Sequence, residues 1–467
     1  MSKDLREFLS LAKKAGPEFY VEVKKPLKPE LEKDVLQLKL YKERGLSPVI
    51  YCPVIKGSKL PLVSNIFGSY ELLGLALGLE PKKATKSQIF HDYLKKKNEL
   101  KPVKKVPASQ APVKEVILKG KDVDLGVLPL IYHAERNSKK YVPIGQMVCR
   151  NPDTGVLNVG VYRHEVKGKD KLGAMFVPDH HAAYHARRYA ELGKPMEVAI
   201  FIGHHPAVAL GSLFKGAMDV NELEVAGGLL GESLRVTKAE TVDLPVPADA
   251  EIVIEGVLDP KKMTTDGPFS EWEGYYGIEL KCYVINITCI TMRKDAIYHD
   301  LAPSQIEHTM AAALNQAAAV YDAVKAVVPT VKDVYLPHSG RSNIVGYVQI
   351  AKRVPGESNR AGIAAVNALS CLKIAVVVDE DIDIYNEDEV IWAIATRTTP
   401  DRDITILPRV LGDPLSPTSY DELRQKRGVM ITKMVIDATK PLETPFPTVV
   451  TPPKDLWQSM KLDDYIK

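Results

Sequence analysis

Cysteine is scarce in this chain, with five residues in 467 and no Cys-x-x-Cys pair. A sparse, odd-numbered set indicates reduced thiols rather than a disulfide framework. Long apolar runs are lacking as well: residues 198–214 come closest, but Gly203, His204, His205 and Pro206 interrupt a run that must reach about 20 residues to cross a membrane. The first residues also lack the apolar stretch of a signal peptide. We therefore expect a cytoplasmic protein that does not enter a membrane.

Neither sign of charge dominates, because 62 lysines and arginines stand against 59 acidic residues, for a net charge of +3. Proteins that bind nucleic acid usually concentrate basic residues on one face, so no nucleic-acid partner is expected. A hydrophobic content of 45% and a charged content of 26% are ordinary for a globular enzyme. The length allows two or three domains of about 100–200 residues each.

The patterns along the first two thirds of the chain predict an α+β fold. Residues 1–112 are expected to form an N-terminal α/β domain that ends in a linker over 95–112, rich in proline and in lysines that should be solvated. Residues 113–302 are rich in strand patterns, including a hairpin around the turn at 151–155. Strands interrupted by a few helices favour a barrel with helical insertions.

The last third of the chain has a different pattern. A long alanine-rich helix is predicted over 303–329, opened by Pro303 and ended by Pro329, and it would connect two domains. Residues 330–467 alternate between strand and helix patterns, which is typical of a C-terminal α/β domain with a mixed sheet covered by helices. The final segment, 456–465, is expected to dock as a helix on a neighbouring subunit.

One segment carries most of the chemical information: it begins at Asp266 and continues Gly-Pro-Phe-Ser-Glu-Trp-Glu-Gly-Tyr-Tyr to Gly277. Its acids Asp266 and Glu271 flank a Gly-Pro pair that breaks helices and central strands, so both acids belong to a loop. Upstream, the run Asn-Val-Gly-Val-Tyr-Arg from Asn158 to Arg163 ends a predicted strand with an arginine. Two carboxyl groups and a guanidinium can bind a substrate carboxylate and transfer one proton.

Together, these two motifs resemble the signatures of the UbiD family, whose members are reversible (de)carboxylases that depend on prenylated flavin mononucleotide (prenylated FMN). The resemblance runs from about residue 4 to about residue 442 and is strongest in 141–282 and 373–440. It implies a split β-barrel flavin-binding domain between the two α/β domains. It also implies that the substrate lies between the barrel and the C-terminal domain.

The resemblance assigns roles to the residues of the motifs. Arg163 would bind the substrate carboxylate, and Glu271 would protonate the carbon that carbon dioxide leaves. Asp266 stands at the first acid position of the family's acid–arginine–acid network, where some members have Glu, and would pair with Arg163. Apolar neighbours would raise the pKa of Glu271. Glu273 is a local rival for the proton role, although it lies outside the matched motif.

The resemblance also implies a metal at the flavin phosphate, held by an asparagine, a histidine and a glutamate. The matching residues are Asn158, His181 and Glu222, whose oxygen and nitrogen donors suit Mn²⁺ or Mg²⁺. His180 is the alternative histidine, and a zinc site built from His181 and His185 is the weaker alternative. A potassium ion is a further candidate cofactor.

Contacts with the flavin are expected from Asn158, Ser212 and Lys433. The last two fall where the family has a loop against the flavin and a lysine that reaches the phosphate. Four histidines have open roles, either structural or close to the substrate: His204, His205, His299 and His308.

The predicted reaction is reversible, non-oxidative decarboxylation (or carboxylation) of an aromatic or heteroaromatic acid, because Trp272, Tyr275 and Tyr276 suggest a flat apolar slot. Carbon dioxide would be the second small-molecule partner, and an FMN prenyltransferase would supply the cofactor. The resemblance further implies a homodimer or homohexamer. Two rival functions are a non-catalytic subunit of a multi-subunit carboxylase and a split-barrel flavin oxidoreductase, although no Gly-x-Gly-x-x-Gly nicotinamide motif is present.

Overall fold

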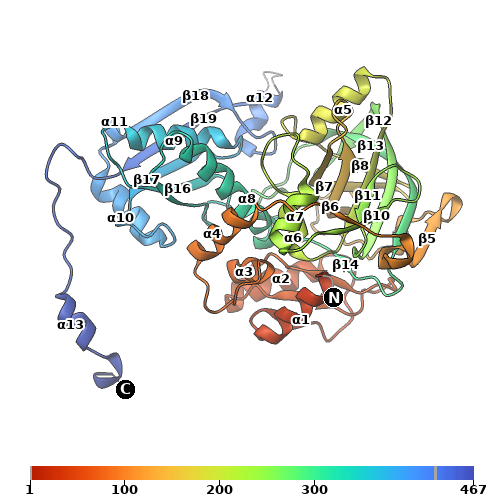
Figure 1. Ribbon diagram of the computed structural model, residues 1–467, viewed down its shortest axis with the longest axis horizontal. Helices are drawn as coiled ribbons and strands as arrows, with labels where there is room; N and C mark the ends of the chain where they lie inside the picture. The colour runs from red at the N-terminus through yellow and green to blue at the C-terminus, as the bar shows by residue number, and fades with distance from the viewer. Residues whose placement is uncertain (1–2, 425–428, 467) are drawn as a thin grey trace.

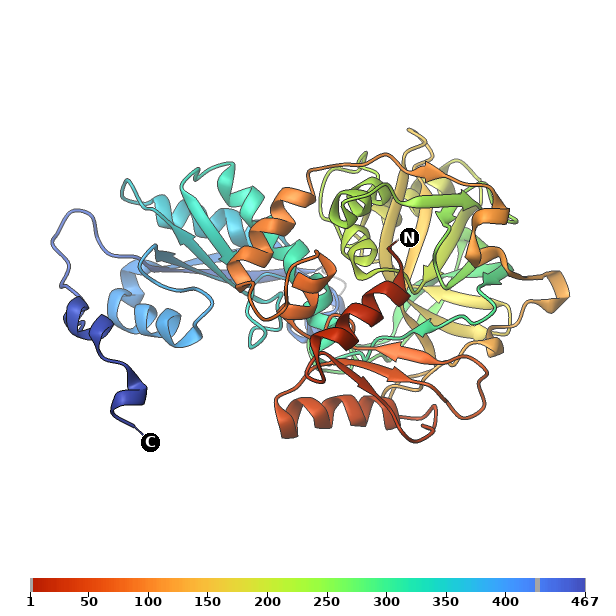
Figure 2. The same cartoon turned by 60° about the horizontal axis from the view of Figure 1, so that its bottom comes forward.

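The computed structural model describes residues 3–424 and 429–466. The N-terminal part of the chain forms a four-stranded sheet accompanied by helices (Figures 1 and 2). The strand order is β1-β2-β3-β14, and β14 comes from much later in the chain to pair in parallel with β3. The elements are α1 (Leu5–Ala15), β1 (Tyr20–Glu22), α2 (Glu32–Arg44), β2 (Val49–Cys52), β3 (Leu62–Ser64), α3 (Tyr70–Ala76), α4 (Lys86–Lys96) and β14 (Tyr298–His299).

Six antiparallel strands close into a barrel in the middle of the chain (Figure 1). The order is β12-β9-β6-β7-β8-β13, the pairing of β13 with β12 closes the ring, and β5 adds to β13. The strands are β5 (Val116–Lys119), β6 (Tyr141–Arg150), β7 (Leu157–Gly168), β8 (Lys171–Ala174), β9 (Met196–Ile202), β12 (Ile252–Asp266) and β13 (Leu280–Met292). The predicted hairpin is confirmed, since Arg150 pairs with Leu157 across its turn.

Helices and two strands of a small second sheet are inserted between the barrel strands, and the third strand of that sheet precedes the barrel (Figure 1). The helices are α5 (His181–Glu191), α6 (Pro206–Ser212) and α7 (Glu222–Leu230). The small sheet consists of β4 (Lys104–Lys105), β10 (Arg235–Lys238) and β11 (Pro245–Pro247). Short 3₁₀ turns cover 108–110, 112–114, 120–122 and 125–127. The predicted barrel with helical insertions is therefore confirmed.

The C-terminal part is a five-stranded mixed sheet in the order β15-β16-β17-β19-β18, parallel at its centre and antiparallel at both edges. The long helix α8 leads into it (Figure 1). The elements are α8 (Ile306–Lys325), β15 (Val331–Tyr335), β16 (Val345–Ile350), α9 (Glu357–Ala368), β17 (Ile374–Asp379), α10 (Glu387–Arg397), α11 (Pro400–Asp403), β18 (Ile404–Leu411), a 3₁₀ turn at Pro417–Ser419, α12 (Tyr420–Arg424) and β19 (Met430–Ala438). This mixed architecture confirms the α+β prediction.

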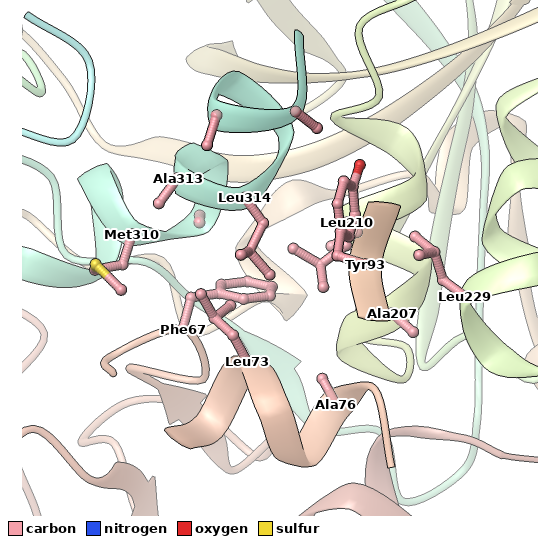
Figure 3. Packing of buried hydrophobic residues seen from close by; sticks show 14 of the residues in the cluster. Phe67, Leu73, Ala76, Tyr93, Ala207, Leu210, Leu229, Met310, Ala313 and Leu314 are labelled. Carbon is pink, nitrogen blue, oxygen red and sulfur yellow. The ribbon is translucent and has the colours of Figure 1, made fainter. Parts of the chain in front are cut away.

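Helix α8 packs where the other parts of the chain meet (Figure 3). Leu314 of α8 is fully buried and lies beside Phe67 and Leu73 of the N-terminal part and near Leu210 of α6. One continuous hydrophobic cluster includes residues of all of these segments and of the C-terminal sheet. Burial of this apolar surface, at about 25 cal/mol per Å², holds the parts together.

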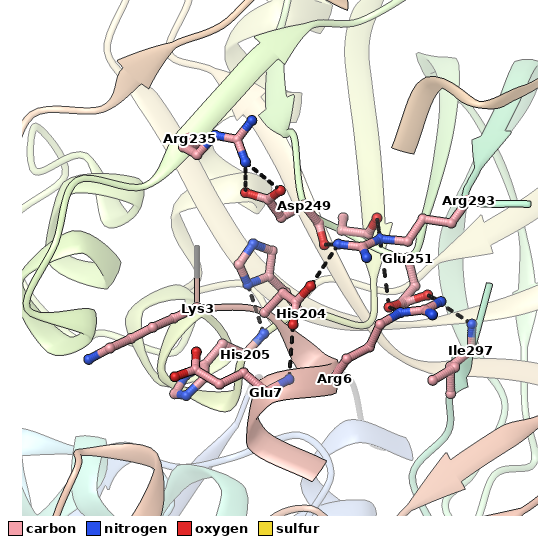
Figure 4. A network of polar contacts seen from close by, with 12 residues as sticks. Lys3, Arg6, Glu7, His204, His205, Arg235, Asp249, Glu251, Arg293 and Ile297 are labelled. Atoms are coloured by element: carbon pink, nitrogen blue, oxygen red, sulfur yellow. Dashed lines mark hydrogen bonds and ion pairs between the residues drawn. The ribbon is translucent and has the colours of Figure 1, made fainter. Parts of the chain in front are cut away.

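A polar network fastens α1 to the barrel (Figure 4). The Arg6 guanidinium donates to both carboxylate oxygens of Glu251 at 3.0 Å. His204 Nδ1 accepts a hydrogen bond from the backbone N–H of His205 at 2.7 Å, and the His205 ring lies edge-on to Phe8 with centroids 5.8 Å apart. The structure therefore gives both histidines structural contacts: His205 packs against α1, and His204 accepts from the backbone of its neighbour.

Three details differ from the sequence-based expectations. Lys97 of the expected solvated linker is instead buried, and its Nζ lies 2.6 Å from Asp322 of α8. Helix α8 begins at Ile306 rather than at Pro303, because Ser304 has a φ of 63°, outside helical geometry. Helix α2 has no predicted counterpart, since its buried positions include the polar residues Lys33, Asp34 and Gln37, and an apolar period is missing.

The chain ends in an extended segment that leads to α13 (Lys454–Ser459) and a 3₁₀ turn (Leu462–Asp464), away from the rest of the molecule (Figures 1 and 2). Trp457 is 74% exposed and Leu462 is 73% exposed. Across the described residues, none of the helices has both the length and the apolar character needed to cross a membrane.

Candidate active site

The loop with the two acids follows directly from a barrel strand. Asp266 is the last residue of β12, and an isolated bridge pairs Ser270 with Tyr276. Within this bridge, the N–H of Glu271 donates to the carbonyl of Tyr275 at 2.8 Å. The loop is therefore a small hairpin that starts at the barrel rim and holds Glu271 close to its turn.

A glycine makes room for the carboxyl group of Glu271. A Cβ added at Gly277 would lie 2.7 Å from Glu271 Oε1 and 3.0 Å from its Cγ, closer than real Cβ contacts. The carboxyl group packs against bare backbone at this point, and Glu271 is only 2% exposed. This close approach explains why the motif needs glycine at the end of its hairpin.

Arg163 of β7 joins the two acids. Its Nε and Nη2 donate to Asp266 Oδ1 at 2.9 and 2.5 Å, and its Nη1 donates to Glu271 Oε1 at 2.5 Å. The guanidinium also lies over the ring of Phe269, 4.6 Å from its centroid. The structure thus brings together the arginine and the two acids that the sequence motifs indicate, over a separation of more than 100 residues.

Burial controls the proton affinities of this group. Removal from water raises the pKa of Glu271 to about 7, although the charge and hydrogen bond of Arg163 oppose the shift. For Arg163, burial disfavours the charge, but Glu271 and Asp266 outweigh it and hold the guanidinium pKa above its ordinary value. The second oxygen of Asp266, Oδ2, has no hydrogen-bond partner among the described residues. An arginine, a fixed carboxylate and a carboxyl that titrates near neutrality therefore meet in one buried place.

Two of the expected metal ligands, one on β7 and one at the start of α7, meet away from this group. The amide of Asn158 lies 2.9 Å from Glu222 Oε1, and the N–H of Val159 donates to Glu222 Oε2 at 2.8 Å. Burial raises the pKa of Glu222 to about 7. A half-turn of the Asn158 amide would present its oxygen beside the carboxylate, and a cation there would compensate the buried charge. The pair fits a divalent ion with oxygen ligands.

The candidate histidine ligands lie at the start of α5. His181 is the first residue of the helix and His180 precedes it, with its ring 6.0 Å from that of Tyr162. Burial lowers the pKa of both. His185 is buried one turn further, with Nδ1 3.7 Å from the sulfur of Cys149. The structure gives neither His180 nor His181 a hydrogen bond to Glu222 within the described residues, so the choice between them stays a prediction.

The two expected flavin contacts have local partners. Ser212 ends α6 and donates its hydroxyl to the carbonyl of Val208 at 2.9 Å. Lys433 of β19 is buried, and its Nζ donates to the carbonyls of Val366 and Leu369 at 2.6 and 2.7 Å. Burial lowers the pKa of Lys433 to about 8. Two of the three donors of this ammonium are therefore engaged by backbone at the end of α9.

The remaining residues of interest have different surroundings. Glu273 is buried, and burial raises its pKa. Tyr275 is 65% exposed, so it does not line an enclosed slot in this structure. His299 belongs to β14, and burial lowers its pKa to about 4. His308, in the first turn of α8, has an Nδ1 that accepts from the N–H of Ser304 at 3.3 Å.

Sequence reasoning did not identify four residues close to the acid loop. All four come after the barrel in the sequence, more than 30 residues from Glu271, and no motif links them to the acid loop. Burial raises the pKa of Asp413 to about 6, and burial, together with the charge of Glu271, raises the pKa of Tyr420. The other two, Ser304 and Arg341, contact the loop backbone directly.

A buried arginine between two acids, beside a closed antiparallel barrel, is suited to an enzyme that acts on a carboxyl group. The chain matches three models that describe parts of the 3-octaprenyl-4-hydroxybenzoate carboxy-lyase: the N-terminal domain over residues 16–89, the Rift-related domain over 104–306 and the C-terminal domain over 308–438. The chain therefore belongs to the UbiD family and is a carboxy-lyase. The resemblance drawn from the motifs is confirmed.

Relatives cover nearly the whole chain. Anhydromevalonate phosphate decarboxylase of Methanothermobacter thermautotrophicus is 33% identical over 83% of this chain and 87% of its own, and that of Methanosarcina mazei is 34% identical over 92% and 96%. The UbiD-class enzyme HmfF of Pelotomaculum thermopropionicum in complex with FMN superposes with a TM-score of 0.88, at 33% identity, over 99% of this chain and 100% of that one. The closed form of vanillic acid decarboxylase from Sedimentibacter hydroxybenzoicus gives a TM-score of 0.88 at 29% identity, over 99% of both chains.

Proposed function

We propose that this protein catalyses the reversible, non-oxidative decarboxylation (or carboxylation) of an aromatic or heteroaromatic acid with prenylated FMN as cofactor. The observation that carries the proposal is the buried contact of Arg163 with both Asp266 and Glu271. Arginine binds carboxylates through paired hydrogen bonds, and a carboxyl that titrates near pH 7 can deliver a proton under ordinary conditions. Family membership and the bound FMN of a similar structure support this assignment.

Each residue has one task in the proposed reaction. Asp266 holds one side of the guanidinium, so that Arg163 keeps its orientation when a substrate carboxylate arrives. When the bond to the carboxylate carbon breaks, the electron pair stays with the substrate carbon and carbon dioxide leaves. The protonated form of Glu271 then gives its proton to that carbon, and water restores it. Prenylated FMN, when bound, supplies the electron sink for the pair.

The proposed cofactor site uses residues on β7, α5, α6, α7 and β19. Asn158, His181 and Glu222 would hold Mn²⁺ or Mg²⁺ against the flavin phosphate, which the adjacent amide and carboxylate of Asn158 and Glu222 support. Ser212 would contact the flavin, and Lys433 would add its charge. A potassium ion is a further candidate. The engaged donors of Lys433 make it the weakest member of this set.

The substrate has two candidate classes. An aromatic acid is the first class. Tyr275 is exposed and gives it no support, so the support comes from the buried Trp272 and from similar structures, one of them named for vanillic acid. A phosphorylated acid is the second class, because two relatives at 33% and 34% identity are named anhydromevalonate phosphate decarboxylases. Both classes would present a carboxylate to Arg163.

A substrate panel tests the proposal. The protein with matured cofactor, verified by absorbance and mass spectrometry of the released flavin, is incubated in deuterium oxide with aromatic, heteroaromatic, acyclic unsaturated and phosphorylated acids. Deuterium at the carbon that carried the carboxylate is expected with aromatic or heteroaromatic acids. Labelling of phosphorylated or acyclic acids alone would contradict the aromatic class and keep the mechanism. No labelling at all would favour the non-catalytic subunit.

The buried Arg163 also bears on the two rival functions. A flavin oxidoreductase has no need of an arginine held between Asp266 and Glu271. A non-catalytic scaffold subunit has no need of it either, because a buried charged cluster is costly unless it has a task. The cluster therefore favours the carboxy-lyase over both.

Two kinds of protein partner belong to the proposal. An FMN prenyltransferase would supply the cofactor. We further propose a homodimer or homohexamer, because the C-terminal segment exposes Leu456 and Trp457 at 53% and 74%, and a second subunit would cover them.

A further inference from the structure

The Glu271 hairpin is held at its backbone by two side chains from outside it. Ser304 Oγ donates to the carbonyl of Glu271 at 2.5 Å. Arg341 Nε donates to the carbonyl of Trp272 at 2.9 Å, and its Nη2 donates to the carbonyl of Ser304 at 2.7 Å. One guanidinium therefore holds the hairpin both directly and through Ser304.

The two side chains come from different parts of the fold. Ser304 lies just before α8, and Arg341 lies in the turn between β15 and β16 of the C-terminal sheet. That turn is closed by its own backbone, since the N–H of Arg341 donates to the carbonyl of His338 at 2.8 Å. The position of Glu271, which belongs to the barrel, thus depends on a contact with the C-terminal part.

The backbone at this contact is strained. Ser304, Arg341 and Ser342 have φ values of 63°, 59° and 53°, in the left-handed region that disfavours residues with a Cβ. They account for three of the six non-glycine residues with positive φ in the described parts of the chain. Such conformations persist where the surrounding structure requires them, and they gather at functional sites.

The charge of Arg341 has no carboxylate partner to explain it. No ion pair within 4.0 Å involves this guanidinium among the described residues, and its hydrogen bonds go to the carbonyls of Trp272 and Ser304. Burial lowers the pKa of Arg341, and the nearby charge of Glu273 opposes the shift. Arg341 is partly buried, and removing a cation from water is unfavourable unless hydrogen bonds replace the lost hydration. The carbonyls of Trp272 and Ser304 supply those hydrogen bonds.

We propose that Arg341 and Ser304 are positioning residues for the reaction: they fix the Glu271 hairpin and thereby align its carboxyl group with Arg163 and the substrate carbon. The proposal rests on the proposed function, in which Glu271 transfers the proton. It goes further by making the docking of the C-terminal part a condition for an aligned proton donor. Neither residue contacts the carboxyl group of Glu271 itself.

The test compares R341A, R341K and S304A in the cofactor-loaded enzyme. We expect kcat of R341A to fall about 10²-fold, the scale for a misplaced catalytic group, with KM changed less than kcat. R341K retains a donor and should lose less. The matched control is R353A in the same part of the fold, because Arg353 is 56% exposed and pairs only with Glu357 among its described contacts. It should behave as wild type.

Hydrogen–deuterium exchange of the cofactor-free protein gives a readout that does not depend on turnover. Amides of 269–277 should exchange faster in R341A and S304A, with no change in the barrel strands and none in R353A. Wild-type exchange in this hairpin, or wild-type kcat in R341A, would overturn the proposal. If instead E271Q were fully active while R341A loosened the hairpin, Glu271 would not be the proton donor. The finding that Arg341 and Ser304 hold the hairpin would still be valid.

The pH profile separates positioning from general destabilisation. The groups that face Glu271 are Arg163, Asp266, Asp413 and Tyr420, and none of these changes in the variants. Water that enters a loosened hairpin should lower the pKa of Glu271, so the decline of kcat with rising pH should begin at lower pH in R341A. An unshifted profile with reduced kcat would contradict positioning and indicate loss of folded enzyme instead.

Discussion

Arg163 Nη1 lies 2.5 Å from Glu271 Oε1, and yet burial raises the pKa of Glu271 to about 7. A guanidinium at this distance by itself lowers the pKa of a carboxyl group. The loss of water around Glu271 therefore outweighs the attraction of the arginine, which is shared with Asp266. The result is a carboxyl group that holds a proton near neutral pH while it remains next to the guanidinium that we propose as the binder of the substrate carboxylate.

Replacement of Glu271 by Gln tests the proton donor. The variant keeps the size and hydrogen-bonding capacity of the side chain and removes its acid, so turnover should fall at least about 10²–10⁴-fold. Cofactor content, measured by absorbance, should not change. E273Q is the matched control two residues away and should retain activity. Near-normal turnover of E271Q together with an inactive E273Q would move the proton role to Glu273.

The same carboxyl group should set the pH dependence of decarboxylation. In the proposed reaction Glu271 must be protonated, so the rate should decline as pH rises through about 7. Carboxylation needs the ionised form and should show the opposite trend. Initial rates between pH 5 and 9 measure both limbs. A decarboxylation rate that is constant from pH 6 to 8 would contradict this assignment.

The proposed metal site can be tested without turnover. Glu222→Ala should lower bound manganese and bound flavin together, because the ion would bridge the carboxylate and the phosphate. His181→Ala should do the same, with circular dichroism as the check on folding. Metal is measured by plasma mass spectrometry and flavin by absorbance. If His180→Ala causes the loss and His181→Ala does not, His180 is the ligand.

We expect Glu307, a buried residue in the first turn of α8, to make the stability of the protein depend on pH. Burial raises its pKa from 4.5 to about 7, so its contribution to stability is present at low pH and is lost as pH rises between these two values. Glu307→Gln removes this loss and should raise the free energy of unfolding at pH 8 by about 1–3 kcal/mol, with little change at pH 5. Chemical denaturation at both pH values measures the difference. Glu191→Gln, at a side chain 63% exposed, is the control and should leave the free energy of unfolding unchanged at both pH values. Equal effects of E307Q at pH 5 and pH 8 would refute the prediction.

The C-terminal segment should carry the oligomer contact. Removal of all residues after Lys440 deletes α13 with its exposed Trp457 and the 3₁₀ turn with its exposed Leu462, and it removes no residue of the buried core. Light scattering after size-exclusion chromatography should show a smaller assembly, while the circular dichroism spectrum stays close to wild type. The double variant W457A/L462A should weaken the assembly in the same direction. An unchanged mass for the shortened chain would exclude this segment as the contact.

Local patterns were sufficient for much of the architecture. The hairpin around 151–155, the strand-rich middle and the alternating C-terminal part follow from side-chain periodicity and turn residues, and the structure confirms them. Helix α2 was not predicted, because its buried face includes Lys33 and Asp34, which pair with charges from elsewhere in the chain. Periodicity detects burial of apolar side chains only, so a helix with buried ions gives no signal. The exact domain limits stay predictions.

The amino-acid sequence by itself determined the family, the chemistry of the motif residues and the loop that presents Asp266 and Glu271, because these depend on residue type and short spacing. Tertiary structure alone decided the pKa of Glu271, because distant segments exclude water from its carboxyl group. It alone also decided the hydrogen bond of Arg341 to the hairpin backbone, because the two lie far apart in the sequence. It also placed Lys433 against two backbone carbonyls. Contacts over long separations arise when the hydrophobic core closes, and no local pattern records them.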